Sequence, residues 1–523
     1  MKNQKEIHKY EGFKLISLYI QGNKLLSKSE LNYNFIEPSD SQKSIYTTVI
    51  IGANGTGKSN LFRIIIELFK QLYDLKDGKK IRSIEGRFKL RFSVNGDVFE
   101  YKNFYENSLF ANSVVTREKV AKHHLMRNGN LIDFKELQLP IAIVANSIML
   151  TDKYPIYNDD KSFPIYKYLG VRNRPQQAST RSYVRKTVEF IVDQFDSDAF
   201  KDGLKRITKY LNIDESIEVI YFTINTPFFF NGNLDPVSFN DYFYKIGSDY
   251  GKKGKEPPYK YNEYKKISNN KVLISEICDF CKSIVPYLKK IDKSSGKWIG
   301  FDILSIEGSR AFKYNYEMLD LLRKLGILTV PDINLKRKDK FLLKESSSGE
   351  YHFFSTMVGL MATVKVNSLL FIDEPEISLH PNWQMKYLAF LREMFLDKEY
   401  ASSHILVATH SHFLISDLKG DSSKIVGLKR NDAGIEMVDL PKDMNTYGWS
   451  AENVLLNVFG VATSRNFYIA ERLSQIFKVA ANSKHPDLSE YKVELLEWHN
   501  QLKASDPLHY TIEKLIERMG WQD

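Results

Sequence analysis

Residues 46–76 combine a strand pattern, a glycine-rich turn and a helix pattern, and this combination constrains the fold more than any other part of the chain. The run YTTVII at 46–51 is rich in β-branched residues, as is typical of a strand buried on both faces. The segment GANGTGKS at 52–59 follows with the spacing of a phosphate-binding loop, and apolar residues then recur at helical spacing over 60–75. Strand, loop and helix in this order predict an α/β core.

A loop of this kind binds the phosphates of a nucleoside triphosphate. Glycines let successive backbone N–H groups point at phosphate oxygens, and the start of the helix adds a favourable dipole. We expect Lys58 to reach the β- and γ-phosphates and the Ser59 hydroxyl to hold Mg²⁺. The expected ATP-binding residues are Gly52, Asn54, Gly55, Thr56, Gly57, Lys58, Ser59 and Asn60.

A second chemical signal lies at 369–374, where the apolar run LLFI ends in Asp373 and Glu374. Side chains alternate along a strand, so two neighbouring acids at its tip diverge and can take different roles. We expect Asp373 to hold Mg²⁺ and Glu374 to act as general base toward the attacking water. Without the phosphate loop, an acid pair in a turn before Pro375 would be the better interpretation.

Two further motifs specify the kind of phosphate-loop protein. The run SSSGE at 346–350 opens a helix pattern and offers hydroxyls and a helix N-terminus to an anion. His410 ends the strand pattern HILVAT at 404–409. Together with the phosphate loop and the acid pair, these motifs resemble the ABC-type ATPase heads of the SMC, RecF-like and OLD-like group. The resemblance covers residues 1 to about 75 and about 340–420.

The resemblance implies an α/β fold, with a mixed sheet, flanking helices and an antiparallel hairpin region. Such heads work as homodimers or higher homo-oligomers, so the signature residues Ser347, Ser348 and Gly349 are expected to act in trans. His410 is expected to sense the γ-phosphate in cis, which makes it catalytic together with Glu374. The implied activity is ATP hydrolysis with Mg²⁺.

The chain departs from the family pattern at two motifs. Its signature reads S-S-G-E where two adjacent glycines are usual, and no glutamine follows the strand pattern near Ile141 as a Q-loop would require. Ser147 or Thr151 would replace that glutamine. These departures favour slow turnover or a nucleotide-dependent shape change.

Three short runs, at 151–155, 166–172 and 447–450, resemble ATPase subunits of Septu-type (PtuA-like) anti-phage systems. That resemblance implies a separate HNH-type nuclease partner, with nucleic acid, including a retron's DNA, as a further candidate. No D-x-D pair follows His410, so we expect no nuclease within this chain. The function we expect is defence through control of that nuclease. The alternatives are a RecF-like or SMC-like DNA-repair ATPase acting directly on DNA, and a nucleotide-gated scaffold with little turnover.

Composition and patterning set the domain organisation. With 523 residues, 43% of them hydrophobic, the chain is long enough for several domains and excludes a disordered tail. Two cysteines exclude a disulfide scaffold, and no run nears the roughly 18 apolar residues of a membrane span, so a cytoplasmic protein without a membrane partner is expected. The expected parts are the two head halves at 1–150 and 336–445, a mainly helical inserted lobe at 151–335 and a helical docking region at 446–523.

Weaker signals leave alternatives open. Residues 245–271 hold eight lysines and four tyrosines, which suit either nucleic-acid binding or a solvated surface. Cys278 and Cys281 have the spacing of half a zinc site, but a buried pair of small side chains fits better. His380 is either part of a dimer-interface turn or a helix cap. The apolar stretches 454–461 and 468–477 form either a core stripe or a partner surface.

Overall fold

The computed structural model describes two compact units, residues 1–447 and 448–523. The described residues are 12–37, 45–104, 123–157, 162–174, 177–178, 180–252, 255–291, 296–395, 400–415, 418, 422–431, 434–438, 471–473, 475–476, 478–479, 488–502 and 507–521. The run 447–450, used above for the Septu resemblance, lies outside them. No described helix is long and apolar enough to span a membrane.

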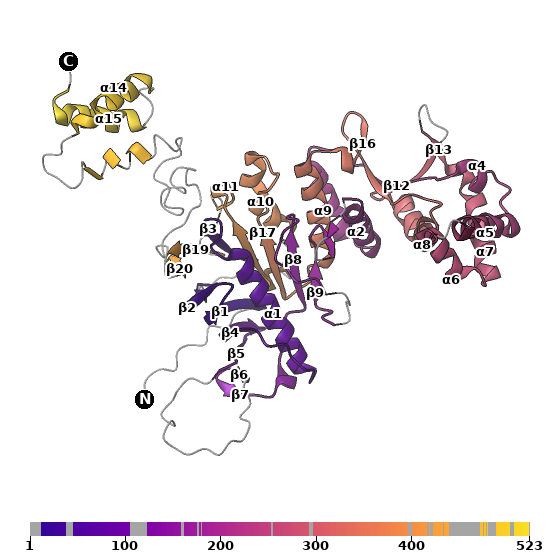
Figure 1. The fold of residues 1–523 in the computed structure, drawn as a ribbon, viewed down its shortest axis with the longest axis horizontal. Helices are drawn as coiled ribbons and strands as arrows, with labels where there is room; N and C mark the ends of the chain where they lie inside the picture. The colour runs from indigo at the N-terminus through magenta and orange to yellow at the C-terminus, as the bar shows by residue number, and fades with distance from the viewer. Residues whose placement is uncertain are drawn as a thin grey trace. The chain divides into compact units, whose positions relative to one another are not determined.

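The centre of the first unit is a seven-stranded sheet in the order β20-β19-β3-β18-β17-β8-β9, parallel except for β20 (Figure 1). Its strands are β3 (Tyr46–Gly52), β8 (Ala142–Ser147), β9 (Tyr166–Tyr168), β17 (Ser368–Asp373), β18 (His404–Thr409), β19 (Ser423–Asn431) and β20 (Gly434–Val438). Every residue of β8, β17 and β18 is buried, as expected for central strands covered on both faces.

A second sheet is antiparallel and has the order β2-β1-β4-β5-β6-β7. Its strands are β1 (Phe13–Asn23), β2 (Ser27–Asn34), β4 (Arg87–Val94), β5 (Asp97–Lys102), β6 (His124–Arg127) and β7 (Asn130–Leu131). Asn95 and Gly96 join β4 to β5 with positive φ angles of 49° and 90°. The hairpin expected at this Asn-Gly pair is therefore confirmed.

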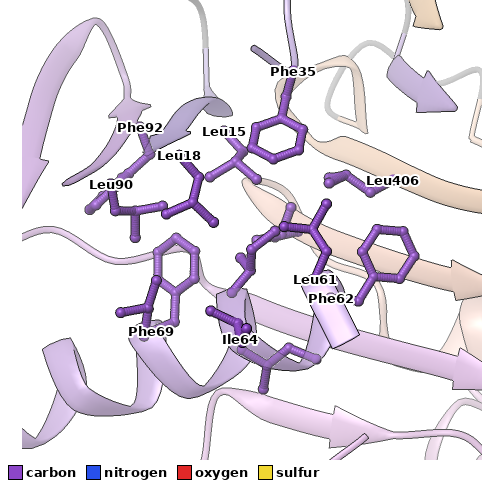
Figure 2. Close-up of a cluster of buried hydrophobic side chains, with 14 of the residues drawn as sticks. Leu15, Leu18, Phe35, Leu61, Phe62, Ile64, Phe69, Leu90, Phe92 and Leu406 are labelled. Atoms are coloured by element: carbon purple, nitrogen blue, oxygen red, sulfur yellow. The ribbon is translucent and has the colours of Figure 1, made fainter. Parts of the chain in front are cut away.

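Helix α1 (Lys58–Lys76) lies between the two sheets and is buried against both. Its Phe69 ring contacts Phe92 of the antiparallel sheet, and its Phe62 ring lies 5.0 Å from that of Phe371 in the parallel sheet. Figure 2 shows these side chains of α1 pointing in the two directions, with Leu406 on the Phe62 side. Because α1 carries the phosphate loop, this core fixes the loop against both sheets.

Seven further described helices belong to this part of the first unit. They are η1 (Phe134–Glu136), α2 (Thr180–Asp193), η3 (Leu343–Glu345), α9 (Ser348–Thr363), α10 (Pro381–Met394), η4 (Tyr400–Ser402) and α11 (His412–Ile415). A small hairpin, β10 (Arg172–Arg174) with β11 (Gln177–Ala178), precedes α2.

The region predicted as a mainly helical inserted lobe contains more strand than its sequence pattern indicated. One strand was expected, over IEVIYFTI, and it forms as β12; four more strands complete a five-stranded antiparallel sheet in the order β13-β14-β12-β15-β16. The strands are β12 (Ile217–Phe222), β13 (Lys289–Lys290), β14 (Lys297–Asp302), β15 (Asp332–Lys336) and β16 (Lys340–Leu342). The helices are α3 (Asp198–Tyr210), α4 (Thr226–Phe229), α5 (Pro236–Lys252), α6 (Tyr259–Ile267), α7 (Lys271–Ser283), η2 (Val285–Tyr287) and α8 (Ile306–Lys324).

In the second unit, the described elements are η5 (Ser489–Tyr491), α14 (Lys492–Gln501) and α15 (Pro507–Met519). The two helices pack on a small core of their own, which includes Ile476, Leu495 and Ile512. At least part of the second apolar stretch, 468–477, is therefore core, because Ile476 is fully buried.

Candidate active site

The carboxyl ends of the parallel strands bring the sequence motifs to one edge of the sheet. Asp373, the last residue of β17, pairs in register with Ala408 of β18 and Ser147 of β8. Thr409 of β18 pairs with Ile51, next to the phosphate loop. Loops at this edge of an open α/β sheet are where ligands bind.

The phosphate loop has the backbone that its glycines permit. Gly55 and Gly57 have φ angles of 80° and 85°, which residues with a side chain rarely adopt. A Cβ atom on Gly52 would stand 2.4 Å from the carbonyl oxygen of Leu428, so β19 closes on the loop too tightly for any other residue. Gly57 caps α1 without a side-chain hydrogen bond, which leaves the first N–H groups of the helix available to an anion.

Other loop residues hold the loop in place. The Thr56 hydroxyl is buried and donates to the Ala53 carbonyl over 2.8 Å, and the Asn60 amide donates to the Leu25 carbonyl over 3.2 Å. Asn54 is exposed. Sequence reasoning missed Arg430 of β19, whose guanidinium donates to the Gly55 carbonyl over 2.9 Å.

Lys58 lies at the centre of the site. Its Nζ donates to the Gly52 carbonyl over 2.9 Å and lies 2.7 Å from Nε2 of His410. Burial lowers the pKa of Lys58 to about 8, although the nearby carboxylates of the β17 segment raise it. Phosphate oxygens would restore a strong partner for this amine.

Asp373 has the features of an incomplete metal site. It is buried, and burial raises its pKa to about 7. Neither carboxylate oxygen makes a hydrogen bond to a described residue, although the Ser59 hydroxyl is near enough to lower the pKa. A buried carboxylate without partners is costly, and oxygen ligands of this kind suit Mg²⁺. Asp373 and Ser59 therefore fit the Mg²⁺ that the resemblance to ABC-type heads implies.

Glu374 leaves the strand with a sharp turn. Its φ angle is 49°, a strained value for a residue with a side chain. Its backbone N–H still donates to the Ala408 carbonyl, while its side chain lies 3.1 Å from Nε2 of His410. The hydrogen bond with His410 lowers the pKa of Glu374, which keeps the carboxylate ionised. The two acids thus have different surroundings: Asp373 lies near Ser59, whereas Glu374 contacts His410.

Glu376 is a second residue that the sequence analysis missed. Its Oε1 accepts the backbone N–H of His410 over 2.6 Å, and its Oε2 is buried with no hydrogen bond to a described residue. Burial raises the pKa of this carboxyl. The available signal was the sequence Glu374-Pro375-Glu376, which places a second acid two residues after the first.

The signature residues form the start of α9. Ser347 is the N-cap, and its hydroxyl accepts the N–H of Glu350, while Glu350 accepts the Ser347 N–H in return. Gly349 lies against the turn that follows the acid pair: a Cβ atom there would stand 2.5 Å from the Ser378 carbonyl oxygen.

The segment after β8, which lacks a Q-loop glutamine, contributes Asp152 to a buried ion pair with Arg172. Ser147 is buried beside Asp373 and its Oγ accepts the Met149 N–H, whereas Thr151 is exposed. Two of the three Septu-like runs, 151–155 and 166–172, meet nearby, because Asp152 accepts hydrogen bonds from Arg172 and from the Tyr168 hydroxyl. The Asp152 carboxylate is close enough to help raise the pKa of Asp373.

A comparison with protein families matches residues 187–416 to a family described as "AAA domain, putative AbiEii toxin, Type IV TA system". Among curated proteins, the Septu protein PtuA of Bacillus thuringiensis is 24% identical over 155 residues. Over these stretches the chain resembles the AAA domain family and PtuA. The matched stretch is 29% of this chain and 36% of PtuA, so the chain spans about a third of that relative's length.

Solved structures of ATPase heads are also similar to the chain. The SMC head domain from Thermotoga maritima has 10% identity and a TM-score of 0.34, covering 82% of this chain and 99% of that one. The SMC head from Pyrococcus furiosus bound to the C-terminal domain of ScpA has 13% identity and a TM-score of 0.31, covering 82% and 96%. RecF with ATPγS has 13% identity and a TM-score of 0.28, covering 83% and 100%.

The structure also describes the weaker candidates from the sequence. Both cysteines are buried in α7, which confirms the structural interpretation, and the described residues contain no group of three or more metal-ligating side chains. His380 caps α10 by accepting the Asn382 N–H. Within the lysine- and tyrosine-rich stretch, Tyr264 is buried against Phe243, whereas Tyr259 is exposed. Nucleic-acid binding by this stretch stays a prediction.

Proposed function

We propose that the chain binds and hydrolyses Mg-ATP in the cytoplasm as one half of a head dimer, and that this cycle controls a separate nuclease. The meeting of Lys58, His410 and Glu374 at one point supports the first part most directly, with distances of 2.7 and 3.1 Å between their side chains. These residues come from three separate segments of the chain. A purely structural role would not require a cation, a histidine and a carboxylate around a phosphate loop.

Each side chain has a role in this proposal. The Lys58 amine neutralises the phosphate charge, and Glu374, kept ionised by His410, accepts a proton from the attacking water. His410 lies between Lys58 and Glu374, so it can respond to the γ-phosphate and to the base together. Bound Mg²⁺, held by Ser59 and Asp373, would offset phosphate charge and orient the oxygens.

The dimer and the nuclease belong to the proposal as well. Ser347, Ser348 and Gly349 act on the nucleotide of a partner copy, as the resemblance to ABC-type heads implies. The likeness to PtuA supports a defence role with an HNH-type nuclease partner. A DNA-repair ATPase acting alone is the rival function, and stimulation of turnover by DNA without a second protein would favour it.

Phosphate release by the purified chain tests the ATPase. Glu374→Gln should bind a fluorescent ATP analogue like the wild type but lower kcat by about 10²- to 10⁴-fold, because the base is lost. Lys58→Ala should lose nucleotide binding. Equal rates for the wild type and Glu374→Gln would contradict catalysis by this site and favour a nucleotide-gated scaffold.

Mixing two inactive variants tests the dimer. Lys58→Ala and Ser347→Ala each lack one half of the site, so a mixed dimer contains one complete site with Lys58 from one copy and Ser347 from the other. Activity above that of either variant alone is expected. No gain on mixing would contradict action in trans. Co-purification with the product of an adjacent HNH reading frame tests the nuclease partner.

A further inference from the structure

Arg337 lies in the turn between β15 and β16 and connects three parts of the first unit. Its Nη2 donates to Oε1 of Glu350 over 2.7 Å and to the Leu211 carbonyl over 3.0 Å. Its Nε donates to the Asn212 carbonyl over 3.1 Å. One guanidinium thus contacts the first turn of the signature helix α9 and the end of the lobe helix α3.

Glu350 binds both Arg337 and the signature residue Ser347. Its second oxygen, Oε2, accepts hydrogen bonds from both the backbone N–H and the hydroxyl of Ser347, each over 3.0 Å. Burial acts to raise the pKa of Glu350, but the hydrogen bonds from Arg337 and Ser347 lower it overall. Arg337, Glu350 and Ser347 therefore form a chain of charge-assisted hydrogen bonds.

The end of α3 is well suited to an arginine. Asn212 has a φ angle of 54°, and the Ile213 N–H reaches back to the Thr208 carbonyl over 2.8 Å, so the helix ends in a left-handed turn. Carbonyl groups at this end carry the negative pole of the helix dipole, which attracts the guanidinium of Arg337.

The same helix end is fixed to the head by Tyr210. Its ring stacks on Phe353 of α9 with centroids 4.5 Å apart, and its hydroxyl donates to the Trp383 carbonyl of α10. The position of α3 is therefore fixed relative to α9 and α10. Because Arg337 binds both the end of α3 and Glu350, the position of α3 determines where the Glu350 side chain lies.

We propose that Arg337 is a positioning residue for the signature motif: by holding Glu350 against the end of α3, it orients Ser347 for the partner copy's γ-phosphate. This inference rests on the proposed head dimer. Its physical basis is geometric. Because 43% of the Arg337 side chain is exposed, the ion pair is screened by water and adds little to stability. The planar guanidinium fork, formed by Nε and Nη2, is held by the carbonyls at the end of α3 and so fixes the direction of Glu350.

Nucleotide binding and turnover of Arg337→Gln separate positioning from folding. The phosphate loop is intact, so the affinity for a fluorescent ATP analogue and the melting temperature should match the wild type. Turnover should fall about tenfold, since a small misplacement of a reacting group costs at least that much. Arg337→Lys keeps the charge without the fork and should recover only part of the rate. Lys338→Gln, an exposed neighbour, is the matched control and should retain the wild-type rate.

Mixing Arg337→Gln with Lys58→Ala provides the deciding measurement. If Arg337 acts through the signature, the mixed dimer has one complete site. That site combines the intact phosphate loop of the Arg337→Gln copy with the intact signature of the Lys58→Ala copy. The rate should then approach that of the Ser347→Ala and Lys58→Ala mixture. A mixture no faster than Arg337→Gln alone would overturn the inference, because the defect would then lie in that copy's own nucleotide site.

The same experiment distinguishes the inference from the proposed function. If the wild type releases no phosphate, or if the Ser347→Ala and Lys58→Ala mixture gains no activity, the head dimer itself is contradicted. If that mixture gains activity and Arg337→Gln turns over like the wild type, only the role of Arg337 is contradicted.

Discussion

The carbonyl oxygen of Ser378 lies 2.5 Å from the point where a Cβ atom would stand on Gly349. Ser378 belongs to the turn that follows Glu374, and its own φ angle is 66°. Gly349 belongs to the signature at the start of α9. The turn after the candidate base and the signature of the same copy thus touch where only a glycine fits, so neither can move far without the other.

Replacing Gly349 by alanine should separate these two segments. Because the atom it meets is backbone, the turn or the helix has to shift, at a cost of about 1–3 kcal/mol in the free energy of unfolding. We expect turnover to fall while binding of nucleotide to the phosphate loop is retained. Urea unfolding and phosphate release measure the two effects.

Gly359 in the same helix provides the control. A Cβ atom there would come no closer than 3.3 Å to any atom, and its neighbours are the side chains of Phe190 and Leu169. Gly359→Ala should therefore be tolerated much better. If it lowers turnover as much as Gly349→Ala does, the contact with Ser378 is not the cause.

The hydrogen bond from the His410 N–H to Glu376 should matter more than the charge of Glu376. Glu376→Gln keeps an oxygen acceptor and should preserve most of the turnover. Glu376→Ala leaves the partly buried His410 N–H without a partner, which costs up to about 1–3 kcal/mol and displaces His410. We expect its kcat to fall about tenfold or more, because His410 contacts both Lys58 and Glu374.

Glu393→Ala, at an exposed position of α10, is the surface control for this comparison. It should leave phosphate release unchanged. Equal losses in Glu376→Gln and Glu376→Ala would show that the negative charge, rather than the acceptor, is what the site requires.

The two thiols should be unreactive in the folded protein. Burial raises the pKa of Cys278 to about 11 and that of Cys281 to about 12, so almost no thiolate is present at pH 8. Ellman's reagent should label neither thiol in native buffer and both in denaturant. Rapid labelling of the native protein, or protection that depends on added zinc, would contradict a purely structural pair.

Local sequence patterns predicted the part of the site that is built from contiguous motifs. The phosphate loop and the acid pair each follow a buried strand, and parallel strands bring such ends to one edge of a sheet. The signature is also a contiguous motif, because Ser347 and Glu350 have the spacing of a capping box at the start of a helix.

Contacts between residues far apart in the sequence could not be predicted from local patterns. Strands β14 and β15 are short, contain polar residues, and pair with β12 residues that lie 76 or more positions away in sequence, so no local period identifies them. The link from Arg337 to the end of α3 depends on a helix end 125 residues earlier. Glu376 was missed because its role depends on the turn that Glu374 begins.

The ion pair of Asp152 and Arg172 should be the most sensitive of the described contacts near the site. The Asp152 side chain is fully buried and that of Arg172 is 9% exposed, so removing one partner leaves an uncompensated charge. Arg172→Ala should lower the free energy of unfolding by about 3–5 kcal/mol. Urea denaturation of the full chain measures this loss.

Lys167→Ala, an exposed position in the same segment, controls for loss of a positive charge and should change stability by less than about 0.5 kcal/mol. The double variant Asp152→Asn with Arg172→Leu removes both charges and should recover part of the stability, because no lone charge remains buried. If the double variant is as unstable as the sum of the two single ones, the two side chains do not act as a pair. The fold near Asp373 would then depend on each of them separately, through Tyr168 and the backbone.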